Sequence, residues 1–95
     1  MIKLPCDLTI AHLDEYQAQI IPIITNSVKE TKPITIDDSE LARIDTLGVQ
    51  FILAVVTYII SQGKEINWQS KSVVLRESIN QLGITDAILL QYIID

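Results

Sequence analysis

The residues with the clearest chemical potential surround Thr46, which lies between Asp45 and the pair Leu47-Gly48. An apolar segment, residues 49–62, follows directly and predicts a helix that ends at Gly63. Thr46 would then lie at a helix N-terminus, where unpaired backbone N–H groups and the helix dipole favour an anion. A phosphate on the Thr46 hydroxyl would be well placed there. The alternative is that Thr46 serves only as an N-cap.

Other kinds of chemistry find little support in the sequence. The chain has one histidine, His12, and one cysteine, Cys6, so no nucleophile–base pair with an orienting group can be assembled. The ligands of a metal site are not clustered, and no glycine-rich phosphate loop follows a strand. Asp37 and Asp38 are interpreted as a solvated turn. We therefore expect a protein that is not an enzyme and that holds no metal and no cofactor.

Composition limits the possible partners. The chain has 95 residues, enough for one domain, and its apolar fraction of 48% suffices for one core. Its net charge of −5 argues against nucleic acid and anionic membrane surfaces. A single cysteine fits a reducing compartment. Because no apolar run approaches the roughly 20 residues that span a bilayer, we expect no membrane insertion and a cytoplasmic location.

Strands and helices alternate along the chain, which predicts an α/β fold. We expect an edge strand near residues 2–4, interrupted by Pro5, and a helix over residues 11–29 that Pro22 kinks or splits. A buried strand at residues 34–37 precedes the helix at 49–62, and a half-exposed strand at 64–69 follows it. A third helix begins at a cap, Ser70 or Ser72, and ends at Gly83. For residues 84–95 a strand is favoured over a short helix.

The helix at residues 49–62 has two apolar stripes. The second one is made by Leu47, Phe51, Val55 and Tyr58. Two interpretations stay open. The stripe is either buried in the core, or it is an exposed patch beside Thr46 that binds a protein partner.

The run from Ile36 to Val49, with Asp45-Thr46-Leu47-Gly48 placed between a strand and a helix, resembles the signature of STAS domains. These are the anti-sigma-factor antagonists and their relatives. The likeness continues through Gly63, the strand with Trp68 and the helix that ends before Gly83. It implies a STAS-like single domain over residues 1–95, with a mixed sheet of about four to five strands and helices packed against it.

By this resemblance the protein is a regulatory interaction module, and Thr46 is its phosphoacceptor. The residues implied to bind the partner are Thr9, Asp38, Ser39, Asp45, Thr46, Leu47, Gly48 and Phe51. The chain departs from the family at Leu47, where members have a small residue, and at Thr9, which replaces an acidic neighbour of the phosphosite.

Three partners remain open under this resemblance: a serine/threonine kinase anti-sigma factor, a chemotaxis component, and a lipid-transport ABC ATPase. In the first two cases, phosphorylation of Thr46 would switch partner binding. In the third case, the chain would be an accessory subunit that binds constitutively through the same face.

Overall fold

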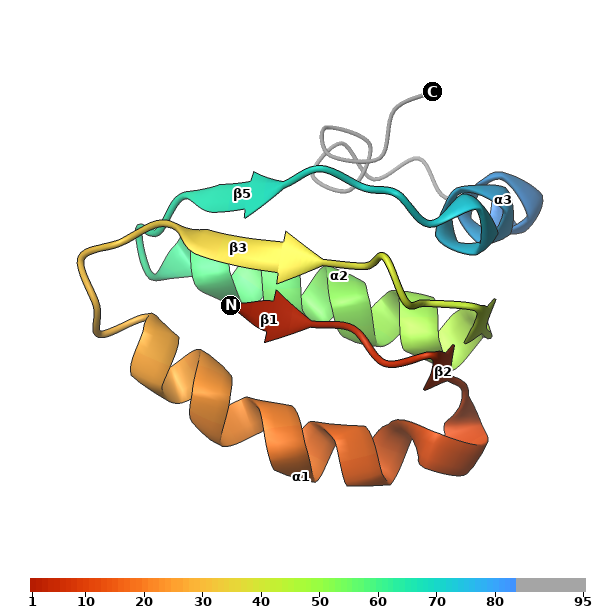
Figure 1. The fold of residues 1–95 in the computed structure, drawn as a ribbon, viewed down its shortest axis with the longest axis horizontal. Coiled ribbons are helices and arrows are strands. Elements are labelled where there is room, and N and C mark those ends of the chain that lie inside the picture. The colour runs from red at the N-terminus through yellow and green to blue at the C-terminus, as the bar shows by residue number, and fades with distance from the viewer. Residues whose placement is uncertain (84–95) are drawn as a thin grey trace.

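The chain folds as alternating strands and helices around one hydrophobic core (Figure 1). The computed structural model describes residues 1–83. In chain order the elements are β1 (Ile2–Lys3), β2 (Asp7–Leu8), α1 (Ile10–Ser27), β3 (Ile34–Asp37), β4 (Arg43–Ile44), α2 (Thr46–Ser61), β5 (Ile66–Trp68) and α3 (Val73–Leu82). This order confirms the α/β class. The strand predicted within residues 84–95 lies outside the described residues.

The strands form two small sheets rather than the single mixed sheet that we expected. One sheet has the order β1-β3-β5, and in the other β2 pairs with β4. Every pairing among the described strands is parallel. Parallel neighbours need a crossover connection, and α1 and α2 supply it. Pro5 lies between β1 and β2, so the first extended segment contributes one short strand to each sheet.

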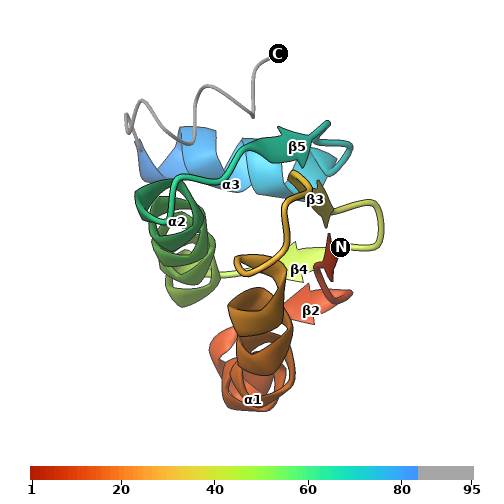
Figure 2. The same ribbon diagram turned by 90° about the vertical axis from the view of Figure 1, so that its left-hand side faces the viewer.

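Helices α1 and α2 cover one side of the three-stranded sheet (Figure 2). The strands alternate accordingly, since Ile34 and Ile36 of β3 are buried while Thr35 between them is only partly so. Trp68 of β5 is 6% exposed, so it belongs to the core. The buried apolar residues of all three helices complete this core: Leu13, Tyr16, Ile20, Ile24, Val49, Ile52, Val56, Ile59, Leu75 and Ile79.

The ends of the helices follow the expected signals, with two differences. Ser72 caps α3 by accepting a hydrogen bond from the Leu75 N–H at 3.1 Å, and Gly83 ends it with φ of 66°. These two predictions are confirmed. Helix α2, however, begins at Thr46 rather than at residue 49. Helix α1 runs unbroken through Pro22, which lies on its exposed surface.

Asp38 is a buried structural residue, not part of a solvated turn. Its side chain is 1% exposed and accepts hydrogen bonds from Ser70 Oγ at 2.6 Å, Lys71 N at 2.7 Å and Trp68 Nε1 at 3.3 Å. These contacts fasten the end of β3 to the segment after β5. The sequence pattern does not reveal this role, because an aspartate pair before a serine also fits an exposed turn.

We expect Asp38→Ala to lower the free energy of unfolding by about 3 kcal/mol, because three internal donors would lose their acceptor. Urea unfolding followed by tryptophan fluorescence and circular dichroism would measure the change. Asp37→Ala, at the neighbouring position, is the matched control and should lower the free energy of unfolding clearly less. Equal losses in the two variants would contradict the role assigned to Asp38.

Candidate functional site

The Asp45 carboxylate joins the starts of two helices. Its Oδ1 accepts a hydrogen bond from the Gly48 N–H at 2.9 Å, which makes Asp45 the N-cap of α2. Its Oδ2 accepts from the Ile10 N–H at 2.8 Å, at the first residue of α1. The hydrogen bonds from Gly48 and Ile10 lower the pKa of Asp45, because they stabilise the charged form.

Thr46 is the first residue of α2 and is exposed. The interpretation of Thr46 as an N-cap is wrong, since the Asp45 side chain holds that position. Within residues 1–83 the Thr46 hydroxyl makes no hydrogen bond. It is therefore accessible for contact with a partner or for modification.

One of the N–H groups at this helix start is already used, because Gly48 donates to Asp45. Asp45 places its own carboxylate against the first turn of α2, so a phosphate on Thr46 would meet a negative charge there. The expectation that the N–H groups of this helix start are free for a phosphate is therefore corrected for Gly48. A phosphate could reach the Gly48 N–H only in competition with Asp45.

Thr9 lies beside this arrangement but does not cap α1. It occupies the N-cap position of α1, yet its hydroxyl donates to Asp7 Oδ1 at 2.7 Å and its N–H to the same atom at 3.1 Å. Hydrogen bonding from the Thr9 hydroxyl is the main cause of the lowered pKa of Asp7. Asp45, which is distant from α1 in the sequence, provides the cap of α1 in place of Thr9.

Gly48 allows the close approach on which this geometry depends. A Cβ atom at position 48 would lie 2.1 Å from the Leu8 carbonyl oxygen and 2.8 Å from Ile44 Cγ1. Strand β2 therefore passes directly against the first turn of α2, where only glycine fits. Gly48 is buried, so it is not accessible to a partner. Its role is to position Asp45 and Thr46.

A hollow of about 170 Å³ lies next to Thr46, between the start of α2 and helix α3. Its lining consists of Ile44, Asp45, Thr46, Ser78, Gln81 and Leu82. The three α3 residues share one helical face by their spacing, and this much is visible in the sequence. That this face meets Thr46 depends on the tertiary structure, and the sequence pattern does not reveal it.

Exposed apolar side chains surround the same end of the molecule. Leu47 is 41% exposed, Leu82 43% and Ile10 67%. The combination of a free hydroxyl, a carboxylate and apolar neighbours is typical of a protein-binding surface.

The stripe of Leu47, Phe51, Val55 and Tyr58 is neither fully buried nor a continuous patch. Phe51 and Val55 are partly buried and pack against the core. The Phe51 ring meets Tyr16 edge-to-face, with centroids 5.9 Å apart and planes at 80°. Leu47 and Tyr58 (42% exposed), at the two ends, are open to solvent. Phe51, implied to bind the partner, therefore has a structural role in joining α1 to α2.

Tyr16 also links the junction of α1 and α2 to Lys3. Its hydroxyl donates to the Lys3 carbonyl oxygen at 2.8 Å, and burial raises its pKa to about 12. The phenol therefore stays neutral at physiological pH and remains a hydrogen-bond donor.

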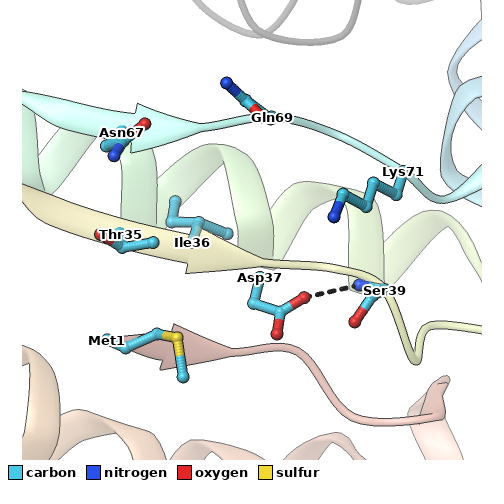
Figure 3. A pocket seen from close by; sticks show the side chains of 8 residues that line it. All are labelled: Met1, Thr35, Ile36, Asp37, Ser39, Asn67, Gln69 and Lys71. Carbon is cyan, nitrogen blue, oxygen red and sulfur yellow. Dashed lines mark hydrogen bonds between the residues drawn. The ribbon is translucent and has the colours of Figure 1, made fainter.

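Asp38 and Ser39 lie apart from the Thr46 hollow. Asp38 is buried, so its side chain is not available to a partner. Ser39 is exposed, and its N–H donates to Asp37 Oδ1 at 2.9 Å. Ser39 lines a different hollow, about 330 Å³ in volume, over the polar side of the three-stranded sheet with Asn67, Gln69 and Lys71 (Figure 3). The residues that the STAS resemblance implies to bind one partner therefore lie in two separate parts of the molecule.

Two further observations concern residues 1–83. No group of three or more His, Cys, Asp or Glu side chains there is arranged to hold a metal ion. None of the helices there is long and apolar enough to cross a membrane.

Comparisons with known proteins gave no match, whether to family models, to curated proteins or to solved structures.

We expect Gly48→Ala to lower the free energy of unfolding by more than about 3 kcal/mol, because the added methyl group collides with the backbone of β2. Thermal and urea unfolding would measure this loss. Gly63→Ala is the matched control. This variant introduces a side chain where φ is 74° but where nothing lies within 4 Å. It should therefore lower the free energy of unfolding by only about 1 kcal/mol. Similar losses in both variants would refute the close approach.

We expect Asp45→Asn to destabilise the fold by about 1 kcal/mol at pH 7, because an amide offers only one acceptor oxygen for the two N–H groups. The lowered folded-state pKa of Asp45 means that its contribution is present above the unfolded pKa of about 3.9 and is lost as pH falls through the folded value. The difference in the free energy of unfolding between wild type and variant should therefore become smaller below about pH 4. Urea unfolding at several pH values tests this, with Asp14→Asn as the control on exposed helix surface. A difference that persists unchanged at pH 3, or is matched by the control, would count against the double cap.

Proposed function

We propose that this chain is a non-catalytic interaction module of the STAS type, which binds a signalling partner at the Thr46 end and is released when Thr46 is phosphorylated. The partner would be a serine/threonine kinase anti-sigma factor or a chemotaxis component. The observation that carries this proposal is the exposed Thr46 hydroxyl, which has no described partner, next to the exposed Leu47 and in the same hollow as the exposed Leu82.

The local framework supports the proposal. Strand β4 leads through Asp45-Thr46-Leu47-Gly48 into α2, which is the strand–turn–helix order that the STAS resemblance implies. The buried glycine and the Asp45 cap hold this turn rigidly. A rigid turn presents Thr46 in one orientation, and such preorganisation favours specific docking.

A phosphate at this position would change the surface in two ways. It would add a charge of about −1.5 to −2 at pH 7 to a surface that otherwise offers leucine side chains and a neutral hydroxyl. It would also repel the adjacent Asp45 carboxylate and compete for the Gly48 N–H. A partner that fits the unmodified surface would then have to bury an unpaired charge, which is costly.

A second candidate is the accessory subunit of a lipid-transport ABC ATPase, in which Thr46 contacts the ATPase and is never modified. The Asp45 carboxylate favours this alternative, because it already occupies the helix start where a phosphate would be stabilised. The two candidates use the same surface and differ in what happens to Thr46.

The test combines quantitative affinity purification with phosphosite mapping. Wild type, Thr46→Ala and Thr46→Glu would serve as baits in native cells, and the phosphorylation of Thr46 would be measured by mass spectrometry. The switch requires phosphate on Thr46 and a partner that the Glu variant loses by at least about tenfold, while the Ala variant retains it. An ATPase retained at equal yield with Thr46 unmodified would support the second candidate.

Thr57→Ala and Thr57→Glu are the matched controls, because Thr57 is also an exposed threonine of α2 but lies outside the Thr46 hollow. They should retain the partner. Circular dichroism of each bait would show that loss of binding is not loss of fold. If the Thr57 variants lost the partner to the same extent, this result would contradict a specific role of Thr46 in binding.

A further inference from the structure

An apolar groove lies between α1 and α2, away from the Thr46 hollow, and is unused by the proposed function. Its volume is about 350 Å³. Phe51 and Val55 are its partly buried residues, and Ile21, Thr25, Ala54 and Tyr58 are its exposed ones. Ile21 is 54% exposed and Tyr58 42%, so large apolar side chains stand open to solvent beside an apolar depression. Such a surface is typical of protein contact sites.

The two helix segments that line the groove contain no charged residue. Residues 16–28 and 46–63 contain no Asp, Glu, Lys or Arg, although charged residues make up 20% of the chain. These two ranges cover most of α1 and all of α2. Because the chain has a net charge of −5, two copies would repel each other across most of their surfaces. They could approach through this neutral face without placing like charges in contact.

The charges at the two ends of the groove have opposite character. Helices α1 and α2 run parallel, since the Ile10 N–H meets Asp45 at their starts and Lys64 Nζ donates to the Glu30 carbonyl oxygen beyond their ends (Figure 1). Asp14, Glu15 and Asp45 lie at the starting end. Beyond the other end lie Lys29, Lys32 and Lys64, with Glu30 and Glu65 partly offsetting them.

One stripe of α1 shows this polarity directly. Asp14, Ala18, Ile21 and Thr25 are exposed and follow each other at helical spacing, and Lys29 comes next, just beyond the end of the helix. An aspartate thus begins the stripe that borders the groove, and a lysine ends it.

We propose that the groove between α1 and α2 is the contact through which two copies of this chain form an antiparallel dimer. A two-fold axis across the groove reverses the helix direction, so that the Asp14 end of one copy meets the Lys29 end of the other. It also sets the aligned dipoles of the two helix pairs in opposite directions, which is favourable. Ile21 and Tyr58 of each copy supply the apolar centre.

A lipid surface fits these observations less well. Helices that lie on membranes carry Lys and Arg along the border of their apolar face. Here the two helices have no Lys or Arg within residues 10–27 or 46–61, and Asp14 and Glu15 border one end.

The oligomeric state tests the proposal. Sedimentation equilibrium from about 1 µM to about 1 mM should show a monomer–dimer equilibrium, and Ala54→Arg should raise the dimer dissociation constant by at least about tenfold, because each guanidinium would be buried without a partner. Ala54 is exposed, so the variant should fold, and Ile21→Gln is a second variant on the other helix. Asn80→Arg, exposed on α3 and outside the groove, is the matched control and should dimerise like wild type.

Charge exchange tests the antiparallel arrangement. Asp14→Lys and Lys29→Asp should each weaken the dimer by about threefold or more, since each places like charges opposite one another twice across the two-fold axis. The double variant should restore the wild-type dissociation constant. Failure of this restoration would overturn the antiparallel contact.

A wild-type protein that stays monomeric at about 1 mM would overturn the proposal, as would a dimer that Ala54→Arg and Ile21→Gln leave intact. A monomer that sediments with vesicles of neutral phosphatidylcholine would assign the groove to a lipid surface instead. None of these outcomes depends on whether Thr46 binds a partner or is phosphorylated.

Discussion

The double cap made by the Asp45 carboxylate is the interaction on which the arrangement of this protein depends. One side chain satisfies backbone donors of two helices that belong to different crossover units, at Gly48 of α2 and at Ile10 of α1. It can do so only because strand β2 passes against the first turn of α2, and that approach requires a glycine at position 48. The helix starts, the two-stranded sheet and the orientation of Thr46 are therefore fixed together.

Asp38 provides a second polar anchor, directly after the end of β3. Asp38 is buried and ties the end of β3 to the segment that follows β5, so a carboxylate organises the interior at the end of the three-stranded sheet. Both anchors are short acidic side chains that accept from backbone N–H groups. Sheets with strands of only two to four residues offer few ladder hydrogen bonds, which explains why such side-chain links matter here.

The two surfaces that arise from this framework differ in chemistry. At the starts of α1 and α2, a hydroxyl and a carboxylate lie among exposed leucine and isoleucine side chains, a mixture that suits a polar and switchable contact. Further along the same helices the surface is apolar and free of charge. Because Phe51, which lines the groove, packs against Tyr16 and joins the two helices, a partner at one end and a second copy at the groove would bind to the same helix pair.

The sequence by itself determined the α/β alternation, the cap and terminal glycine of α3, and the position of Thr46 at a helix start. These features follow from local periodicity and capping chemistry, which short segments encode. Only the tertiary structure decided that Asp45 caps two helices, that Asp38 is buried, that the strands divide into two parallel sheets, and that α3 meets Thr46. The partners in these contacts lie far apart along the chain, as Asp45 and Ile10 do. No local pattern can show which distant donor reaches a given carboxylate, because the packing of the core makes that choice.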